Sequence, residues 1–185
     1  WLNNNYKSSP KLVIDLDEIK KKFIKFKRGF GKITPYYAVK ANSNKKILSL
    51  LNSLGCYFDC ASINEIIACK RHKISPAKIS FGNTIKKSED IKKAFMIGVN
   101  LFAFDCEEEL LKISEFATGS NVYCRLQVYN GGAEWPLSKK FGCSAKELEY
   151  LLIKAKKIGL YPLGISFHVG SQQLSKQTWE KAIKA

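Results

Sequence analysis

The chain has 185 residues, of which 45% are hydrophobic and 12% aromatic. These values are typical of a globular domain with a packed core, and they exclude an intrinsically disordered chain. The formal net charge is +15, but only three of the 31 basic residues are arginine. Because arginine favours base readout and bidentate phosphate contacts, we expect no nucleic-acid partner. The lysines occur in pairs, 86–87 among them, and this pattern predicts solvated helix faces.

No apolar run reaches the roughly 18 residues that a membrane span needs, so we expect no membrane association. The six cysteines are scattered without a C-x-x-C pair and are accompanied by only two histidines, so we expect no metal centre. Reduced, buried cysteines are typical of a cytoplasmic protein, which is the location we predict. The chain opens with Trp1 and stops inside a helical pattern at 176–185, which indicates a fragment.

The first predicted elements are a short strand at 11–16 and a lysine-rich amphipathic helix at 17–28. Short apolar runs then recur along the chain, and most of them precede a helical pattern. These predicted strands are residues 36–40, 57–61, 79–82, 101–104, 122–128 and 164–169. The alternation predicts a parallel sheet with helices outside it.

Local signals support the helix boundaries. Two capping boxes predict helix starts, namely Ser62 with Glu65 and Ser144 with Glu147. Three glycines predict helix ends, namely Gly55, Gly98 and Gly159. Periodicity alone leaves open a doubly wound sheet or a (β/α)₈ barrel. The glycine-rich turn of a nucleotide-binding sheet is absent, so we favour an α/β fold of the (β/α)₈ TIM-barrel type.

Polar residues lie at or near the carboxyl ends of the predicted strands, where barrels place their active sites. They are Lys40, Asp59, Asn83, Asp105, Arg125 and His168. Lys40 follows an apolar run and would be costly to bury as a cation, so we expect a carboxylate partner or a covalent one. Arg125 lies inside an apolar run, which leaves open an ion pair with Asp105 or Asp59, or a cofactor contact.

Three segments in this order resemble the fold-type III pyridoxal-phosphate-dependent decarboxylases. They are PYYAVKAN at 35–42, FDCAS at 58–62 with Glu65, and FHVGS at 167–171. SPKLVIDL at 9–16 is similar to the opening strand of that family. The FDCAS segment is more similar to the ornithine and lysine decarboxylases than to the diaminopimelate decarboxylases. Residues 81–87 and 134–142 resemble the bacterial branch that accepts both diamino acids.

The resemblance implies decarboxylation of ornithine or lysine to putrescine or cadaverine, a step of polyamine biosynthesis. It implies that Lys40 forms the internal Schiff base with pyridoxal 5′-phosphate, that His168 stacks on its ring, and that Ser171 bonds near its phosphate. Asp59, Glu65 and Arg125 match charged positions around the cofactor. We nevertheless assign Glu65 a structural role first, because it can complete the capping box with Ser62.

The resemblance also implies a division of the chain into residues 1–16, an opening strand that joins a carboxy-terminal β-domain, and 17–185, a partial barrel. The remaining site residues would come from beyond Ala185 and across a homodimer interface, so we expect the fragment to be inactive and to fold poorly by itself. Two alternatives stay open. One is a non-catalytic relic or regulatory homologue, and the other is a diaminopimelate-decarboxylase-like or alanine-racemase-like enzyme.

Overall fold

The structure, a computed structural model, describes residues 10–128 and 140–184. In this part of the chain six strands form one sheet, and each strand is parallel to its neighbour. The strands are β1 (Tyr36–Ala38), β2 (Tyr57–Cys60), β3 (Ile79–Phe81), β4 (Leu101–Phe104), β5 (Asn121–Leu126) and β6 (Tyr161–Phe167). All six follow the predicted runs, with shifts of one to three residues at most ends.

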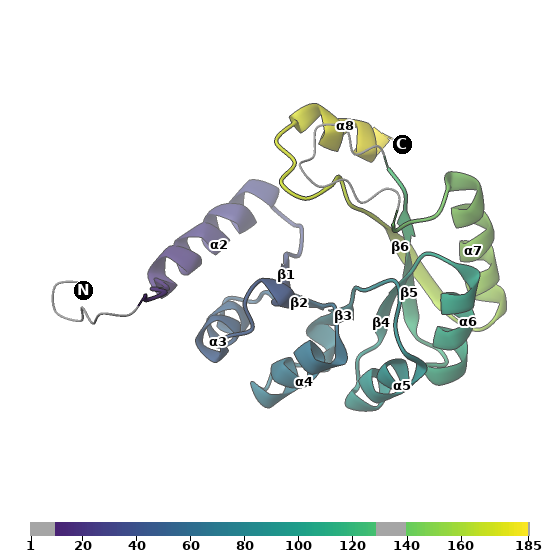
Figure 1. The fold of residues 1–185 in the computed structure, drawn as a ribbon, viewed down its shortest axis with the longest axis horizontal. Helices are drawn as coiled ribbons and strands as arrows, with labels where there is room; N and C mark the ends of the chain where they lie inside the picture. Colours follow the sequence, from purple (N-terminus) through teal and green to yellow (C-terminus); the bar gives the residue numbers. More distant parts are fainter. Residues whose placement is uncertain (1–9, 129–139, 185) are drawn as a thin grey trace.

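Seven described α-helices accompany the strands. They are α2 (Leu16–Phe30), α3 (Lys45–Ser53), α4 (Ile63–Arg71), α5 (Ser88–Ile97), α6 (Glu107–Phe116), α7 (Ala145–Lys157) and α8 (Lys176–Lys184). Two 3₁₀ turns, η1 (Val39–Ala41) and η2 (Pro76–Lys78), complete the described elements. Figure 1 shows α3 to α7 as an arc along one face of the sheet, whereas α8 lies apart from this arc. Helix α2 packs beside α3, and its Leu16, Ile19 and Phe23 contact the apolar core. None of the described helices combines the length and apolar character that crossing a membrane demands.

The strand order decides between the two folds that periodicity left open. The strands lie side by side in chain order, from β1 to β6. A doubly wound sheet would instead reverse its order at a switch point. An order without reversal, with helices along one face, is the winding of a β/α barrel, so the predicted fold class is confirmed. Within the described residues β1 and β6 are not paired with each other.

Side-chain alternation separates the core from the opposite, concave face of the sheet. Phe58, Phe81, Phe102 and Phe104 are fully or almost fully buried in one large apolar cluster with the helices. The neighbouring positions point the other way, because successive side chains of a strand face opposite sides. These positions carry the polar residues, so the helix-facing side stabilises the fold while the concave side is free for chemistry.

The predicted helix ends are largely confirmed. Ser144 and Glu147 form a complete capping box at the start of α7. At α4 the Ser62 side chain accepts from the Glu65 amide, but the Glu65 carboxylate accepts from the Ala61 amide instead of the Ser62 amide. Gly55, Gly98 and Gly159 all have positive φ, as expected at the ends of helices.

Two predictions differ from the structure. Residues 10–15 form neither helix nor strand, and Leu16 is the first residue of α2, because the Asp15 side chain accepts from the amides of Asp17 and Glu18 and caps the helix there. Lys86 does not lie on a solvated face: its side chain is fully buried and ion-paired with Glu109 at 2.9 Å. A pair of adjacent lysines therefore does not predict solvent exposure where one of the two can reach a buried carboxylate.

Candidate active site at the carboxyl edge of the sheet

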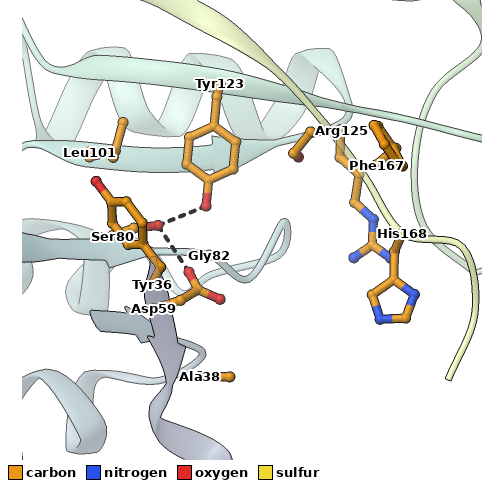
Figure 2. A pocket seen from close by; sticks show the side chains of 11 residues that line it. Tyr36, Ala38, Asp59, Ser80, Gly82, Leu101, Tyr123, Arg125, Phe167 and His168 are labelled. Atoms are coloured by element: carbon orange, nitrogen blue, oxygen red, sulfur yellow. Dashed lines mark hydrogen bonds between the residues drawn. The ribbon is translucent and has the colours of Figure 1, made fainter. Parts of the chain in front are cut away.

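A cavity of about 390 Å³ opens on the concave side of the sheet. Its walls come from all six strands or the residues directly after them. The lining residues that carry polar side chains are Tyr36, Asp59, Ser80, Tyr123, Arg125, Ser166 and His168. Three residues predicted from the strand ends, Asp59, Arg125 and His168, therefore meet in one cavity (Figure 2).

Asp59 and Ser80 are direct neighbours across β2 and β3, because the register pairs their Cα atoms. Ser80 Oγ donates to Asp59 Oδ1 at 3.0 Å. Burial raises the pKa of the Asp59 carboxyl, while the Ser80 hydrogen bond and the charge of Lys40 lower it in part. The carboxylate is thus half-enclosed, with one oxygen already held by the protein.

Ser80 and Tyr123 are site residues that the sequence reasoning missed. The two hydroxyl oxygens lie 2.7 Å apart, and Figure 2 shows the line of hydrogen bonds from Tyr123 through Ser80 to Asp59. A signal was present in the sequence. Tyr123 lies two residues before Arg125 and therefore on the same face of β5, and Ser80 interrupts an otherwise apolar strand.

Gly82 shapes the cavity by its lack of a side chain. A Cβ atom at this position would lie 2.0 Å from Asp59 Oδ1, far inside van der Waals contact. The Gly82 amide also donates to the Cys60 carbonyl at 2.8 Å, which holds the residue after β3 against the end of β2. The Asp59 carboxylate therefore lies directly against the backbone of the β3–α5 loop.

Arg125 makes neither of the predicted ion pairs: no carboxylate of the described residues lies within ion-pairing distance of its guanidinium. The guanidinium lies over the Phe141 ring, 5.0 Å from its centroid. Asp105, one of the predicted partners, instead accepts from the Gly142 amide at 2.8 Å and thereby holds the segment before α7. Phe141 has no side-chain hydrogen-bond acceptor, so the guanidinium, which has no carboxylate partner among the described residues, can still donate its N–H groups to an anion.

His168 follows β6 and is exposed at the cavity wall. The Gly170 amide donates to its Nδ1 at 2.9 Å, so Nδ1 carries a lone pair and a neutral ring bears its proton on Nε2. Partial burial, followed by the charges of Arg125 and Lys40, lowers the pKa of the imidazole. These effects favour the neutral form of the ring.

Lys40 is exposed and lies in η1, directly after β1. This differs from the prediction of a costly burial, because the chain turns out of the sheet one residue earlier, at Val39. Its ammonium forms no ion pair with a described residue. Lys40 is not among the residues that line the cavity, but Ala38, two residues earlier, is, and the Lys40 charge lowers the pKa of both Asp59 and His168.

Three other candidate residues lie outside the cavity lining. The Glu65 carboxylate accepts from the Ala61 amide at 2.8 Å, which supports the structural role predicted for it. Asn83 donates to the Ile85 carbonyl at 2.8 Å within its own loop. Ser171 is exposed in the loop between β6 and α8. The structure therefore brings Asp59, Arg125 and His168 together in one cavity, and it leaves Lys40 and Ser171 outside the lining.

A parallel α/β sheet that gathers charged side chains at its carboxyl edge defines an enzyme domain of the β/α-barrel class. Residues 16–185 match the family model described as "Pyridoxal-dependent decarboxylase, pyridoxal binding domain". The chain therefore belongs to the pyridoxal-dependent decarboxylase family, as its motifs predicted.

Curated relatives include the ornithine decarboxylase of Rattus norvegicus, which is 34% identical over 92% of this chain and 37% of its own length. The ornithine decarboxylase of Saccharomyces cerevisiae is 38% identical over 93% of this chain and 37% of its own length. Antizyme inhibitor 2 of Xenopus laevis is 34% identical over 92% of this chain and 38% of its own length. The chain thus spans well under half the length of these relatives.

Solved structures agree with this assignment. The lysine decarboxylase of Selenomonas ruminantium superposes with a TM-score of 0.86 at 34% identity, over 91% of this chain and 44% of that one. The arginine decarboxylase of Paramecium bursaria Chlorella virus gives a TM-score of 0.88 at 32% identity, over 91% of this chain and 46% of that one. The relatives with known structures thus include decarboxylases of more than one basic amino acid.

Proposed function

We propose that this chain is the cofactor-binding barrel part of a pyridoxal-phosphate-dependent decarboxylase that converts ornithine or lysine to a diamine. The observation that carries the proposal is that Asp59 and His168 line one cavity at the carboxyl edge of a parallel sheet, with Lys40 two residues after the lining residue Ala38. Each residue lies in one of the segments that resemble the family. Lys40 follows β1 and Asp59 lies in the neighbouring β2, whereas His168 follows β6 at the opposite edge of the described sheet.

The residues of the cavity fit this cofactor. A volume of about 390 Å³ is within the range of small-molecule sites. Gly82 lets the Asp59 carboxylate pack directly against the backbone, which keeps that carboxylate at the cavity wall. Lys40 supplies an exposed primary amine, the group that an aldehyde requires. The donor set is therefore that of an aldehyde-bearing, anionic aromatic ligand.

When bound, pyridoxal phosphate supplies an electron sink for the electrons that remain as carbon dioxide leaves. The residues of this chain hold and orient it. Lys40 would hold the cofactor through its amine, and the flat, neutral His168 ring would lie against the cofactor ring without adding charge. Asp59 would face a cationic or N–H group, and the free edge of Arg125 would face an anionic one.

The choice of substrate is the finer part of the proposal. The ornithine decarboxylase relatives and the motif at 58–62 favour ornithine or lysine. Residues 134–139, part of the second segment that resembles the bacterial branch, lie outside the described residues. A basic substrate requires carboxylates that the described cavity does not supply beyond Asp59, so we place the substrate-reading residues in other parts of the intact protein.

The domain division is proposed on the same basis. Residues 11–14 form no strand in this chain, yet Leu12 and Val13 are strongly exposed for apolar side chains. They would pair with the carboxy-terminal β-domain of the intact protein. The homodimer, the contact of Ser171 with the phosphate and the cytoplasmic location are likewise part of the proposal.

The proposal is tested by reducing the intact protein with borohydride in the presence of pyridoxal phosphate and mapping the labelled peptide by mass spectrometry. We expect the pyridoxyl group on Lys40 and its loss in Lys40→Arg. The buried Lys86 provides the internal comparison, because its ammonium already contacts Asn83 O, Ala103 O and Glu109. A label on any lysine other than Lys40 overturns the assignment.

Turnover assays then distinguish decarboxylation of ornithine or lysine from decarboxylation of diaminopimelate and from alanine racemisation. The substrates are L-ornithine, L-lysine, meso-diaminopimelate and D- and L-alanine. Carbon dioxide and a diamine from ornithine or lysine are expected. Racemisation, or turnover of diaminopimelate alone, would favour the other enzymes. A non-catalytic or regulatory homologue is the second candidate, because one relative carries the name of an inhibitor, antizyme inhibitor 2, and not that of an enzyme. That candidate predicts neither label nor turnover.

A further inference from the structure

We propose that Tyr123 and Ser80 are positioning residues that hold the Asp59 carboxylate in a single orientation, with Oδ1 bound to the protein and Oδ2 presented to the ligand. The role of this orientation in cofactor binding rests on the proposed function. The hydrogen bonds from Tyr123 through Ser80 to Asp59 can be tested without any cofactor. Neither Tyr123 nor Ser80 lies in a motif that supports the family assignment.

The donor and acceptor in each of these two hydrogen bonds follow from the number of hydroxyl protons available. Ser80 has one hydroxyl proton, and its oxygen lies 3.0 Å from Asp59 Oδ1 and 2.7 Å from Tyr123 Oη. An ionised carboxylate only accepts hydrogen bonds, so the Ser80 proton points to Asp59. Tyr123 must then donate to Ser80. The tyrosine is thus a fixed donor at the far end of a two-step chain.

Packing around Asp59 restricts its carboxylate to the position in which it accepts from Ser80. Ser80 is only 3% exposed, and its register opposite Asp59 is fixed by the parallel pairing of β2 and β3. On the other side Gly82 lies so close that a Cβ would meet Oδ1 at 2.0 Å. Oδ1 is therefore enclosed by a donor and by backbone, while Oδ2 makes no hydrogen bond within the described part of the chain. Oδ2 is the atom suited to an ammonium or a ring N–H of a ligand.

The groups around Asp59 act on its pKa in opposite directions, so the hydrogen bond from Ser80 affects how readily the carboxyl ionises. Burial, the largest effect, raises the pKa of Asp59, and the Glu65 carboxylate on α4 acts in the same direction. Lys40 after β1 and Arg125 on β5 act in the opposite direction, as does the Ser80 hydrogen bond. Burial also raises the pKa of Tyr123, so that its hydroxyl keeps its proton and remains a donor. Ser80 and Tyr123 thus favour the ionised form of Asp59 from the side opposite the ligand.

The first test needs no cofactor. The intact protein is labelled with carboxyl-¹³C aspartate, and the Asp59 resonance, assigned by its loss in Asp59→Asn, is followed as a function of pH. Ser80→Ala removes the donor to Oδ1, and Tyr123→Phe removes the donor that polarises Ser80. We expect both variants to move the Asp59 titration to higher pH, with the larger shift in Ser80→Ala.

Tyr150→Phe is the matched control, because it also removes one hydrogen-bonded tyrosine hydroxyl, whose acceptor is Glu107 on α6. It should leave the Asp59 titration where it is in the wild type. If neither Ser80→Ala nor Tyr123→Phe shifts the titration, or if Tyr150→Phe shifts it equally, the positioning role is wrong.

The second test asks whether the orientation matters for the ligand. Tyr123→Phe should weaken the equilibrium binding of pyridoxal phosphate by about 2- to 10-fold, the range of one indirect hydrogen bond. The same change in an Asp59→Asn background should have no further effect, because the tyrosine acts only through the carboxylate. An equal loss in both backgrounds would contradict the inference.

The two proposals fail in different ways. If the wild-type protein does not bind pyridoxal phosphate, the proposed function is wrong, and a shifted Asp59 titration still establishes the chain. If the wild type binds the cofactor but the titration of Asp59 is unmoved in both variants, the positioning role is wrong and the proposed function stands.

Discussion

Gly82 lines the cavity at a position that has no room for a side chain. It has an ordinary backbone conformation, so the requirement for glycine comes from space alone. The nearest atoms to an added Cβ are all three terminal atoms of the Asp59 side chain, between 2.0 and 2.7 Å away. A residue that contributes no chemistry therefore determines where a chemically active one can lie.

We predict that Gly82→Ala destabilises the intact protein by about 1–3 kcal/mol, the usual cost of overpacking a well-filled site. The added methyl group must push Asp59 out of its hydrogen bond with Ser80. Denaturant unfolding measures the loss. In an Asp59→Ala background, where the colliding atoms are gone, most of the cost should vanish.

Gly164→Ala is the control for that prediction, because Gly164 also lies at a strand and an added Cβ would meet nothing within 4 Å. It should change the stability by no more than about 0.5 kcal/mol. Equal losses in the two alanine variants would mean that glycine is needed at 82 for a reason other than the approach of Asp59.

His168 provides a prediction about pH. Burial, then Arg125 and then Lys40 lower its pKa below the ordinary value of 6.5. The unfolded chain therefore binds the proton first as the pH falls. Consequently the contribution of His168 to stability is present above pH 6.5 and is lost as the pH falls from 6.5 through the lower, folded-state pKa.

We expect the ring resonances of His168 to titrate below pH 6.5 in an NMR experiment on the intact protein. Arg125→Met should move this titration to higher pH, because it removes a positive charge while keeping an apolar contact with Phe141. Lys40→Met should move it in the same direction. A shift to lower pH in either variant would show that the cations do not act on the imidazole.

At the scale of the elements, Lys86 is the centre of the loop that joins β3 to α5. Its ammonium donates to Asn83 O at 2.8 Å and to Ala103 O at 2.6 Å, and it lies 2.9 Å from Glu109 Oε1. These three partners come from the loop, from β4 and from α6. Burial nevertheless lowers the pKa of Lys86 to about 8, so the pair with Glu109 only partly offsets the loss of hydration.

We predict that Lys86→Met destabilises the intact protein by about 3–5 kcal/mol, because it removes the buried partner of Glu109, leaves the partly exposed Lys112 as its remaining ion pair and frees two carbonyl groups. The neighbouring Lys87→Met, at an exposed position, should cost less than about 0.5 kcal/mol. Denaturant unfolding of the two variants compares them. A double variant, Lys86→Met with Glu109→Leu, should recover part of the loss, and no recovery at all would show that the charge of Glu109 is not the cause.

The same loop shows what the sequence can predict and what it cannot. Periodicity left the strand order open. The positions of the strands, most helix caps and the placement of Asp59, Arg125 and His168 at strand ends follow from short-range patterns and were predictable. The partners of Lys86 and the contact of Gly82 with Asp59 were not, because they join residues on different β/α units. Such contacts depend on the register between strands, which a single sequence with two-residue periodicity leaves undetermined.

At the scale of the whole molecule, the described sheet has two open edges, β1 and β6. The first is three residues long, whereas β6 has seven. Three apolar side chains of β6 are more than half exposed, namely Tyr161, Leu163 and Ile165. A long edge strand with exposed apolar side chains is a surface that pairs readily with other chains.

We predict that the 185-residue chain, expressed by itself, neither melts in one sharp transition nor stays monomeric, because six strands do not close an eight-stranded barrel. Calorimetry should give a broad transition, and light scattering should give a mass that rises with concentration. Leu163→Lys should reduce the association, since a charge on an exposed edge opposes pairing, whereas the same change at Leu111 on the exposed side of α6 should not. A sharp, concentration-independent melt of a monomer would show that the six strands are sufficient for the core, and the open edges would then have to be covered within the chain itself.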